Sequence, residues 1–207
     1  MARPPKDMDL HNMTWLISSL DMAIYGNPVR LDYIEKILKN YEKKYEGINY
    51  LKISNSLKSI EKIMLEKVYT VKTRRKLKFL NYGTRSFLIA AIAIAFITLF
   101  LKMNYLIIIF YILFIISVLM LIINFLMLRS LDKIIEKMDD LDFLKEKEYI
   151  ISVNQYLIDI LSKKMKEKNA NPRDYRIPLK SEYKNLEIVS RSNFMRKYYN
   201  GIIKIQP

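Results

Sequence analysis

The chain has 207 residues and carries 35 Lys and Arg against 21 Asp and Glu, which gives a formal net charge of +14. It contains no cysteine, which excludes disulfides, thiolate metal sites and cysteine nucleophiles. Hydrophobic residues make up 51% of the chain but are concentrated in its centre, so a polar arm of comparable size remains on either side.

The N-terminal arm is predicted to begin with two amphipathic helices, because apolar residues recur there at helical spacing. The first stripe ends at Gly26 and consists of Met13, Leu16, Ile17, Leu20 and Ile24. Asn27 and Pro28 then provide an N-cap and a first-turn proline for a second helix, which is expected to end at Gly47. The apolar stripe of this second helix is Leu31, Ile34, Ile37, Leu38, Tyr41 and Tyr45.

A third helix is predicted to start near residues 54–56 and to carry its apolar residues on one face. These residues are Leu57, Ile60, Met64, Val68 and Val71. A basic cluster then interrupts the stripe within residues 72–85, a segment without acidic residues. The cluster marks the approach to a membrane surface and consists of Lys72, Arg74, Arg75, Lys76, Lys78 and Arg85.

Two uncharged apolar runs follow, residues 87–101 and 105–128, and only residues 102–104 separate them. About 20 apolar residues let a helix cross roughly 30 Å of hydrocarbon while it satisfies its own backbone polar groups. The second run reaches this length, and the first does so if it begins near residue 82, with Arg85 extending back to the headgroups. We therefore predict a two-span transmembrane helical hairpin with spans at 82–101 and 105–128.

Basic residues near the spans predict the orientation of the hairpin. The basic cluster precedes the first span, and Arg129, Lys133 and Lys137 follow the second, whereas the connecting turn carries Lys102 alone. Basic residues close to a span stay on the cytoplasmic side, so both termini are expected in the cytoplasm. The expected location is the cell (inner) membrane, as a multi-pass protein whose partners include a lipid bilayer with anionic headgroups.

The second span is predicted to continue into the cytoplasm as an amphipathic helix as far as residue 168. Residues 169–178, with two prolines and two asparagines, are the best candidate for a linker, and residues 192–203 form either a short amphipathic helix or an extended tail. The predicted fold class is therefore all-α, with cytoplasmic amphipathic helices on both sides of the hairpin. Its domains are an N-terminal helical arm (1–81), the hairpin (82–128) and a C-terminal helical arm and tail (129–207).

Small and polar residues in the two apolar runs predict where the hairpin helices pack. They are Ser86, Ala91, Ala95, Ser117 and Asn124. Such residues either pack the two helices against each other or join copies of the chain, with Ser117 and Asn124 lining a hydrated seam. Packing is the favoured interpretation, because neither run contains an ionisable residue of the kind that transport pathways use.

A row of carboxylates lies on nearly one face of the helix predicted after the second span. The row consists of Asp132, Glu136, Asp139 and Glu146. Three interpretations of this row are open. It could be a solvated charged face, it could pair with Arg74, Arg75 and Lys78 at the same membrane surface, or it could bind a divalent cation. The solvated face is the favoured interpretation, and neighbouring lysines disfavour a cation.

The sequence offers no catalytic constellation, so the chain is not expected to be an enzyme. His11 has no companion at metal-ligand spacing, and the glycines at positions 26, 47, 83 and 201 stand singly, without a phosphate-binding or dinucleotide-binding loop. No cofactor and no metal are predicted. Signatures of nucleic-acid-binding modules are missing too, so nucleic acid is not an expected partner.

The expected function is that of a non-enzymatic interaction or assembly platform, anchored by the hairpin and facing the cytoplasm. Its expected partners are an unidentified cytoplasmic protein or further copies of the chain in a homo-oligomer. The alternative is a homo-oligomeric pore or channel-like effector in which the hairpin surrounds a conducting path. The layout of basic helix, two-span hairpin and cytoplasmic helix resembles that of small two-span membrane effectors in prokaryotic defence systems. That resemblance of layout implies no site residues.

Overall fold

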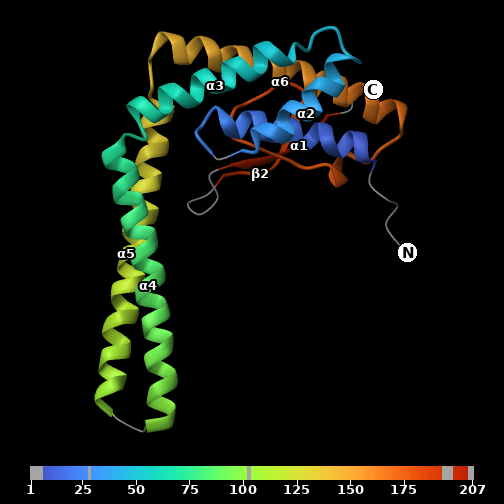
Figure 1. Cartoon of the computed structure of the whole chain (residues 1–207). Helices are drawn as coiled ribbons and strands as arrows, with labels where there is room; N and C mark the ends of the chain where they lie inside the picture. The colour runs from blue at the N-terminus through green and yellow to red at the C-terminus, as the bar shows by residue number, and fades with distance from the viewer. Residues whose placement is uncertain (1–6, 28, 102–103, 193–197, 205–207) are drawn as a thin grey trace. The chain divides into compact units, whose positions relative to one another are not determined.

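The computed structural model describes residues 7–27, 29–101, 104–192 and 198–204, and the chain is mostly helical (Figure 1). It divides into two compact units. Unit 1 combines the described residues up to Ile63 with those from Met138 onwards, and unit 2 is Met64–Lys137. Segments from both ends of the chain therefore build unit 1.

Unit 1 has α1 as its central helix. It consists of α1 (Met8–Ala23), α2 (Leu31–Glu42), most of α3 (Tyr50–Lys67), α6 (Leu141–Glu167) and a small C-terminal sheet. α1 contacts α2, α6 and the first strand of the sheet. The apolar stripe predicted for this helix is confirmed, because Met13, Leu16, Ile17, Leu20 and Ile24 are all completely buried. The Asp7 carboxylate caps α1 by accepting hydrogen bonds from the N–H groups of Asp9 and Leu10.

Two of the predicted helix starts are wrong. α2 begins at Leu31, because the Asn27 amide turns back to the Met22 carbonyl (3.1 Å) instead of capping a new helix. Pro28 lies outside the described residues. α3 begins at Tyr50, before the predicted start, because the Asn49 side-chain oxygen accepts the N–H of Lys52 (2.9 Å).

The predicted helix from the second span to residue 168 is interrupted. Four residues separate the end of α5 (Asn104–Glu136) from the start of α6 at Leu141. Asp140 caps α6 with an extended backbone (φ −63°, ψ 123°) and accepts the N–H of Phe143 (3.0 Å). Phe143 is completely buried, whereas Leu141, the first residue of α6, is 84% exposed. Local capping here overrides the apolar spacing.

The C-terminal segment forms an antiparallel sheet, so the expectation of an all-α chain is too narrow. A 3₁₀ turn (η1, Pro172–Asp174) within the predicted linker precedes β1 (Ile177–Leu179), β2 (Leu186–Ser190) and β3 (Tyr199–Ile203). The order is β1-β3-β2, with Gly201 of the central strand opposite both Ile177 and Ile188. The described part of the tail is thus extended and paired, and residues 193–197 lie outside the described residues.

Unit 2 consists of the last residues of α3 with α4 (Val71–Leu101) and α5, which lie side by side (Figure 1). α3 and α4 are separate helices, because the N–H groups of Val68 and Tyr69 both bond the Met64 carbonyl and so close the end of α3. Val71, predicted to continue the α3 stripe, begins α4 and is 58% exposed. Residues 102–103 of the predicted turn lie outside the described residues.

A buried carboxylate on α1 holds the segment that joins β1 to β2. Asp21 is completely buried. It accepts hydrogen bonds from the backbone N–H of Lys180, from the backbone N–H of Ser181 (3.2 Å) and from the Tyr183 hydroxyl (2.8 Å). Burial raises the pKa of Asp21 above its ordinary value of 3.8, and these donors oppose that effect by favouring the ionised form.

Tyr183 extends this network to α6. Burial and the nearby Asp21 carboxylate raise the pKa of Tyr183, so its hydroxyl stays protonated and donates to Asp21. The same hydroxyl accepts a hydrogen bond from the Asn154 amide (3.1 Å), which also reaches the Ile17 carbonyl on α1 (3.2 Å). One chain of buried and partly buried hydrogen bonds therefore ties α1, α6 and the segment between β1 and β2 together.

Two ion pairs join the start of α1 to the end of α6. Lys164 contacts Asp9, and Lys168 contacts Asp7 (2.6 Å). Burial would raise the pKa of Asp9, but the hydrogen bond and charge of Lys164 hold it below its ordinary value of 3.8. The hydrogen bond from Lys168 is the largest effect that lowers the pKa of Asp7. The ionised carboxylates thus stabilise the folded chain.

We predict that Asp21→Ala destabilises the chain by about 3 kcal/mol, because it leaves three buried or partly buried donors without an acceptor while it removes a desolvated charge. The midpoint of thermal unfolding of the full chain in detergent, followed by circular dichroism, measures the change. Glu187→Ala on β2, where the side chain is exposed, is the matched control and should change stability by less than about 0.5 kcal/mol. Equal midpoints for the two variants would contradict the assigned role of Asp21.

We predict that Lys164→Met lowers the stability at neutral pH by about 0.5–1 kcal/mol, a figure reduced for solvent screening. Because the pKa of Asp9 is lower in the folded chain, the contribution is complete above the ordinary value of 3.8 and disappears as the pH falls through the folded value. The stability curves of wild type and variant against pH should therefore converge in acid. Lys163→Met, at an exposed neighbouring position, is the control, and a difference that persists unchanged in acid would exclude the Asp9 ion pair as its cause.

Candidate functional site

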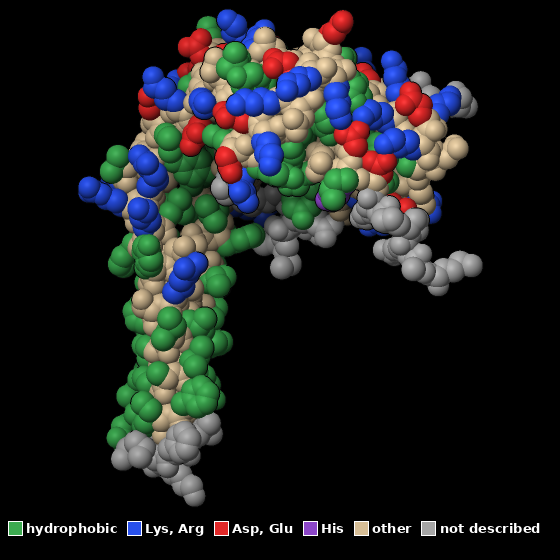
Figure 2. Space-filling model, turned by 45° about the vertical axis from the view of Figure 1, so that its right-hand side comes forward, with side chains coloured by type: hydrophobic (Ala, Val, Ile, Leu, Met, Phe, Trp, Pro, Cys, Tyr) green, Lys and Arg blue, Asp and Glu red, His purple; other side chains and the backbone are tan. Residues whose placement is uncertain are grey.

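The most distinctive surface of the molecule is the apolar exterior of α4 and α5. Two segments are long and apolar enough to cross a membrane, Val71–Thr98 and Tyr105–Glu136. Only 6% of the most apolar stretch of each is buried, whereas the core helix of a soluble protein is mostly buried. Ile89, Phe96 and Ile108 are each more than 60% exposed, and hydrophobic side chains cover most of the visible face of the two helices (Figure 2).

Small residues line the contact between α4 and α5. Ala91 is completely buried, and Ser117 is 3% exposed and donates a hydrogen bond to the Thr84 carbonyl (3.2 Å). Gly83 belongs to the same contact, because a Cβ there would stand 2.8 Å from the Met120 sulfur. Gly83 is not among the predicted packing residues, although its small size, which is typical of residues at helix crossings, could have identified it.

The other predicted packing residues lie less deeply. Ala95 and Asn124 are half-buried, and Ser86 is exposed. The hydrogen bond of Ser117 is made within the pair of helices, so its hydroxyl serves their packing. The structure therefore brings Ala91 and Ser117 into the contact and leaves Ser86 at its margin.

The basic cluster lies along the first half of α4. Its six side chains are all exposed: Lys72, Arg74, Arg75, Lys76, Lys78 and Arg85. Lys and Arg side chains gather toward one end of the α4 and α5 pair in Figure 2. This end combines a basic surface with an adjacent apolar one, which is the combination that an anionic lipid surface attracts.

The four predicted carboxylates do not share one helix. Asp132 and Glu136 belong to α5, Asp139 lies in the connection, and Glu146 belongs to α6. Asp132 is half-buried near Tyr69, where burial and then the Asp132 charge raise the pKa of the tyrosine. Among the described residues, no three His, Asp or Glu side chains gather closely enough to hold a metal ion.

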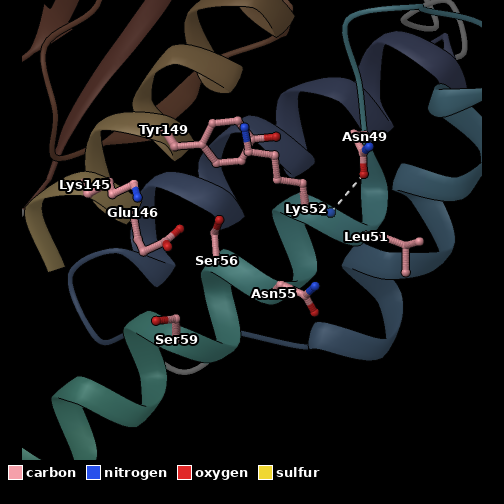
Figure 3. A pocket seen from close by; sticks show the side chains of 9 residues that line it. All are labelled: Asn49, Leu51, Lys52, Asn55, Ser56, Ser59, Lys145, Glu146 and Tyr149. Atoms are coloured by element: carbon pink, nitrogen blue, oxygen red, sulfur yellow. Dashed lines mark hydrogen bonds between the residues drawn. The ribbon is translucent and has the colours of Figure 1, made fainter. Parts of the chain in front are cut away.

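Unit 1 has an open groove of about 710 Å³ between α3 and α6, which the sequence analysis missed (Figure 3). The α3 side presents Lys52, uncharged amides and hydroxyls such as Asn55 and Ser56, and the α6 side presents Lys145, Glu146 and Tyr149. The sequence feature that could have indicated this groove is the group of Asn and Ser residues at positions 49–59, in an arm otherwise rich in charged residues. Their helical spacing alone would assign these residues to a solvated face.

The groove combines hydrogen-bonding groups with an aromatic ring. The Lys52 ammonium lies over the Tyr149 ring, 4.3 Å from its centre. Burial and then the Glu146 carboxylate raise the pKa of Tyr149, so its hydroxyl is a neutral donor and acceptor. This arrangement suits polar recognition of another molecule. It does not include an activated nucleophile or an acid–base pair in its described lining.

No protein-family model, curated protein or solved structure matches this chain.

We predict that Ala91→Leu forces α4 and α5 apart, because its larger side chain must enter a completely buried contact. The expected destabilisation is about 1–3 kcal/mol. Thermal unfolding of the full chain in detergent measures it. Ala93→Leu makes the same change at an exposed position two residues away and should be neutral. If both variants unfold at the wild-type temperature, Ala91 does not lie in a close helix contact.

Proposed function

We propose that the chain is an integral membrane protein, anchored by α4 and α5 as a two-span hairpin, which presents unit 1 in the cytoplasm as a non-enzymatic interaction or assembly platform. The observation that carries the proposal is the apolar exterior of the two helices, whose most apolar stretches are only 6% buried. Exposure of so much apolar surface to water is unfavourable by about 25 cal/mol per Å², whereas hydrocarbon accepts it without that penalty.

The proposed orientation rests on charge. The basic cluster lies at the start of α4, and Arg129, Lys133 and Lys137 lie toward or just beyond the end of α5. Both groups stand at the ends of the helices remote from residues 102–104, so retention of basic residues in the cytoplasm leaves both termini there. Anionic headgroups of the inner membrane then neutralise the basic cluster, at about 1 kcal/mol for each nearby charge.

The platform role rests on the groove between α3 and α6. Its uncharged amides and hydroxyls, with Lys52 and Lys145 beside Glu146, can bind a polar surface of a cytoplasmic protein or of a second copy. A homo-oligomeric pore is the alternative use of the same hairpin. The Ser117 hydroxyl favours packing over a pore, because it bonds the Thr84 carbonyl instead of facing a hydrated path.

We predict that single cysteines in this cysteine-free chain will report the orientation directly. In intact spheroplasts, a membrane-impermeant maleimide should label Lys102→Cys at once and should label Glu187→Cys only after lysis. Ala93→Cys is the control for a lipid-facing position and should stay unlabelled in both cases. Immediate labelling of Glu187→Cys in intact cells would contradict the proposed topology.

A dye-leakage assay with the purified full chain in liposomes distinguishes the platform from the pore. Vesicles that retain an entrapped dye support the platform. Dye release that rises with protein density, and that Ser117→Leu abolishes, would overturn it in favour of a pore.

A further inference from the structure

The only histidine and the only tryptophan of the chain line one cavity in unit 1. His11, Trp15 and Ser18 follow one another at spacings of four and three residues, so they share one face of α1. Opposite them lies the segment that runs from η1 into β1 and contributes Arg173 and Arg176. The cavity has a volume of about 510 Å³.

The two guanidinium groups are the strongest hydrogen-bond donors available in this cavity. The hydroxyls of Thr14 and Ser18 already donate to the carbonyls of His11 (2.8 Å) and Pro178 (2.9 Å). Both arginine side chains are exposed, and neither forms an ion pair with any residue that the structure describes. Their two positive charges exceed the single negative charge of Asp174, the one carboxylate among the described residues of the lining. The cavity therefore favours an anion.

Trp15 adds a flat apolar surface that is held in place. Its side chain is half-buried, and its ring packs edge-on against Tyr33 with 4.6 Å between ring centres. A small inorganic anion would fill only part of the cavity, whose volume lies within the range of small-molecule sites, about 300–1,000 Å³. The ligand that fits both the charge and the surface is an anion that carries a planar ring.

We propose that this cavity binds an organic phosphate with a planar ring, of the size of a nucleoside monophosphate. The phosphate is bound by Arg173 and Arg176, because guanidinium groups match phosphate oxygens in bidentate geometry. The ring of the ligand contacts Trp15, and the imidazole of His11 lies beside the same space. The proposal stands independently of the membrane topology proposed above.

Trp15 provides the assay, since it is the only tryptophan. The full chain in detergent micelles is titrated with AMP, adenosine and inorganic phosphate while tryptophan fluorescence is recorded, and calorimetry measures the same three probes. We expect saturable AMP binding with a Kd below about 1 mM, and binding at least about tenfold weaker for adenosine and for phosphate, each of which lacks one half of the ligand. Phosphate that binds as tightly as AMP would overturn the role of the ring.

Matched variants test the role of the arginines. The double substitution Arg173→Ala with Arg176→Ala should weaken AMP binding by at least about tenfold, and Arg30→Ala, which removes an exposed arginine paired with Asp32, should leave it unchanged. Circular dichroism of the double variant should match wild type, because both arginines are exposed. AMP binding that the double variant retains, or an absence of saturable binding in both assays, would overturn the proposal.

Discussion

The organisation of unit 1 depends on one desolvated carboxylate. Asp21 sits on the central helix, away from solvent, and such a charge is tolerated only where donors surround it. Its donors come from the backbone after β1 and from Tyr183, both far along the chain. The sheet is too small to persist alone, since its strands have three to five residues, and this network attaches it to the helices.

The interruption at Asp140 decides how the two units are connected. A continuous helix would make α5 and α6 one element, although they belong to different units. The cap instead starts a new helix whose buried face, from Phe143 to Met165, belongs to unit 1. As a result, unit 1 is assembled from both sides of the apolar segment. A partner that binds the groove between α3 and α6 would contact both halves of the chain at once.

The groove and the cavity offer different chemistry on the same unit. The groove has uncharged amides and hydroxyls with charges of both signs, which suits a polar protein surface. The cavity has two guanidinium groups and a fixed indole, which suits a small anion. Both are formed by segments distant in sequence: residues 49–59 meet 145–149 in the groove, and residues 11–18 meet 173–178 in the cavity. A ligand in the cavity would contact α1 and β1, and Asp21 bonds α1 to the segment directly after β1.

Features that depend on local composition could be predicted from the amino-acid sequence. The apolar runs predicted the two long exposed helices, and the 3.6-residue period predicted the buried stripe of α1, because both follow from burial of neighbouring side chains. The sheet, the break between α5 and α6, the groove and the cavity depend on contacts or caps that the apolar pattern does not predict. The strands have little local signal and form because they pair with each other and pack on α1 and α6, and the carboxylate row was lost when one side-chain cap divided its helix. The groove and the cavity required contacts across more than 80 residues, which no periodicity encodes.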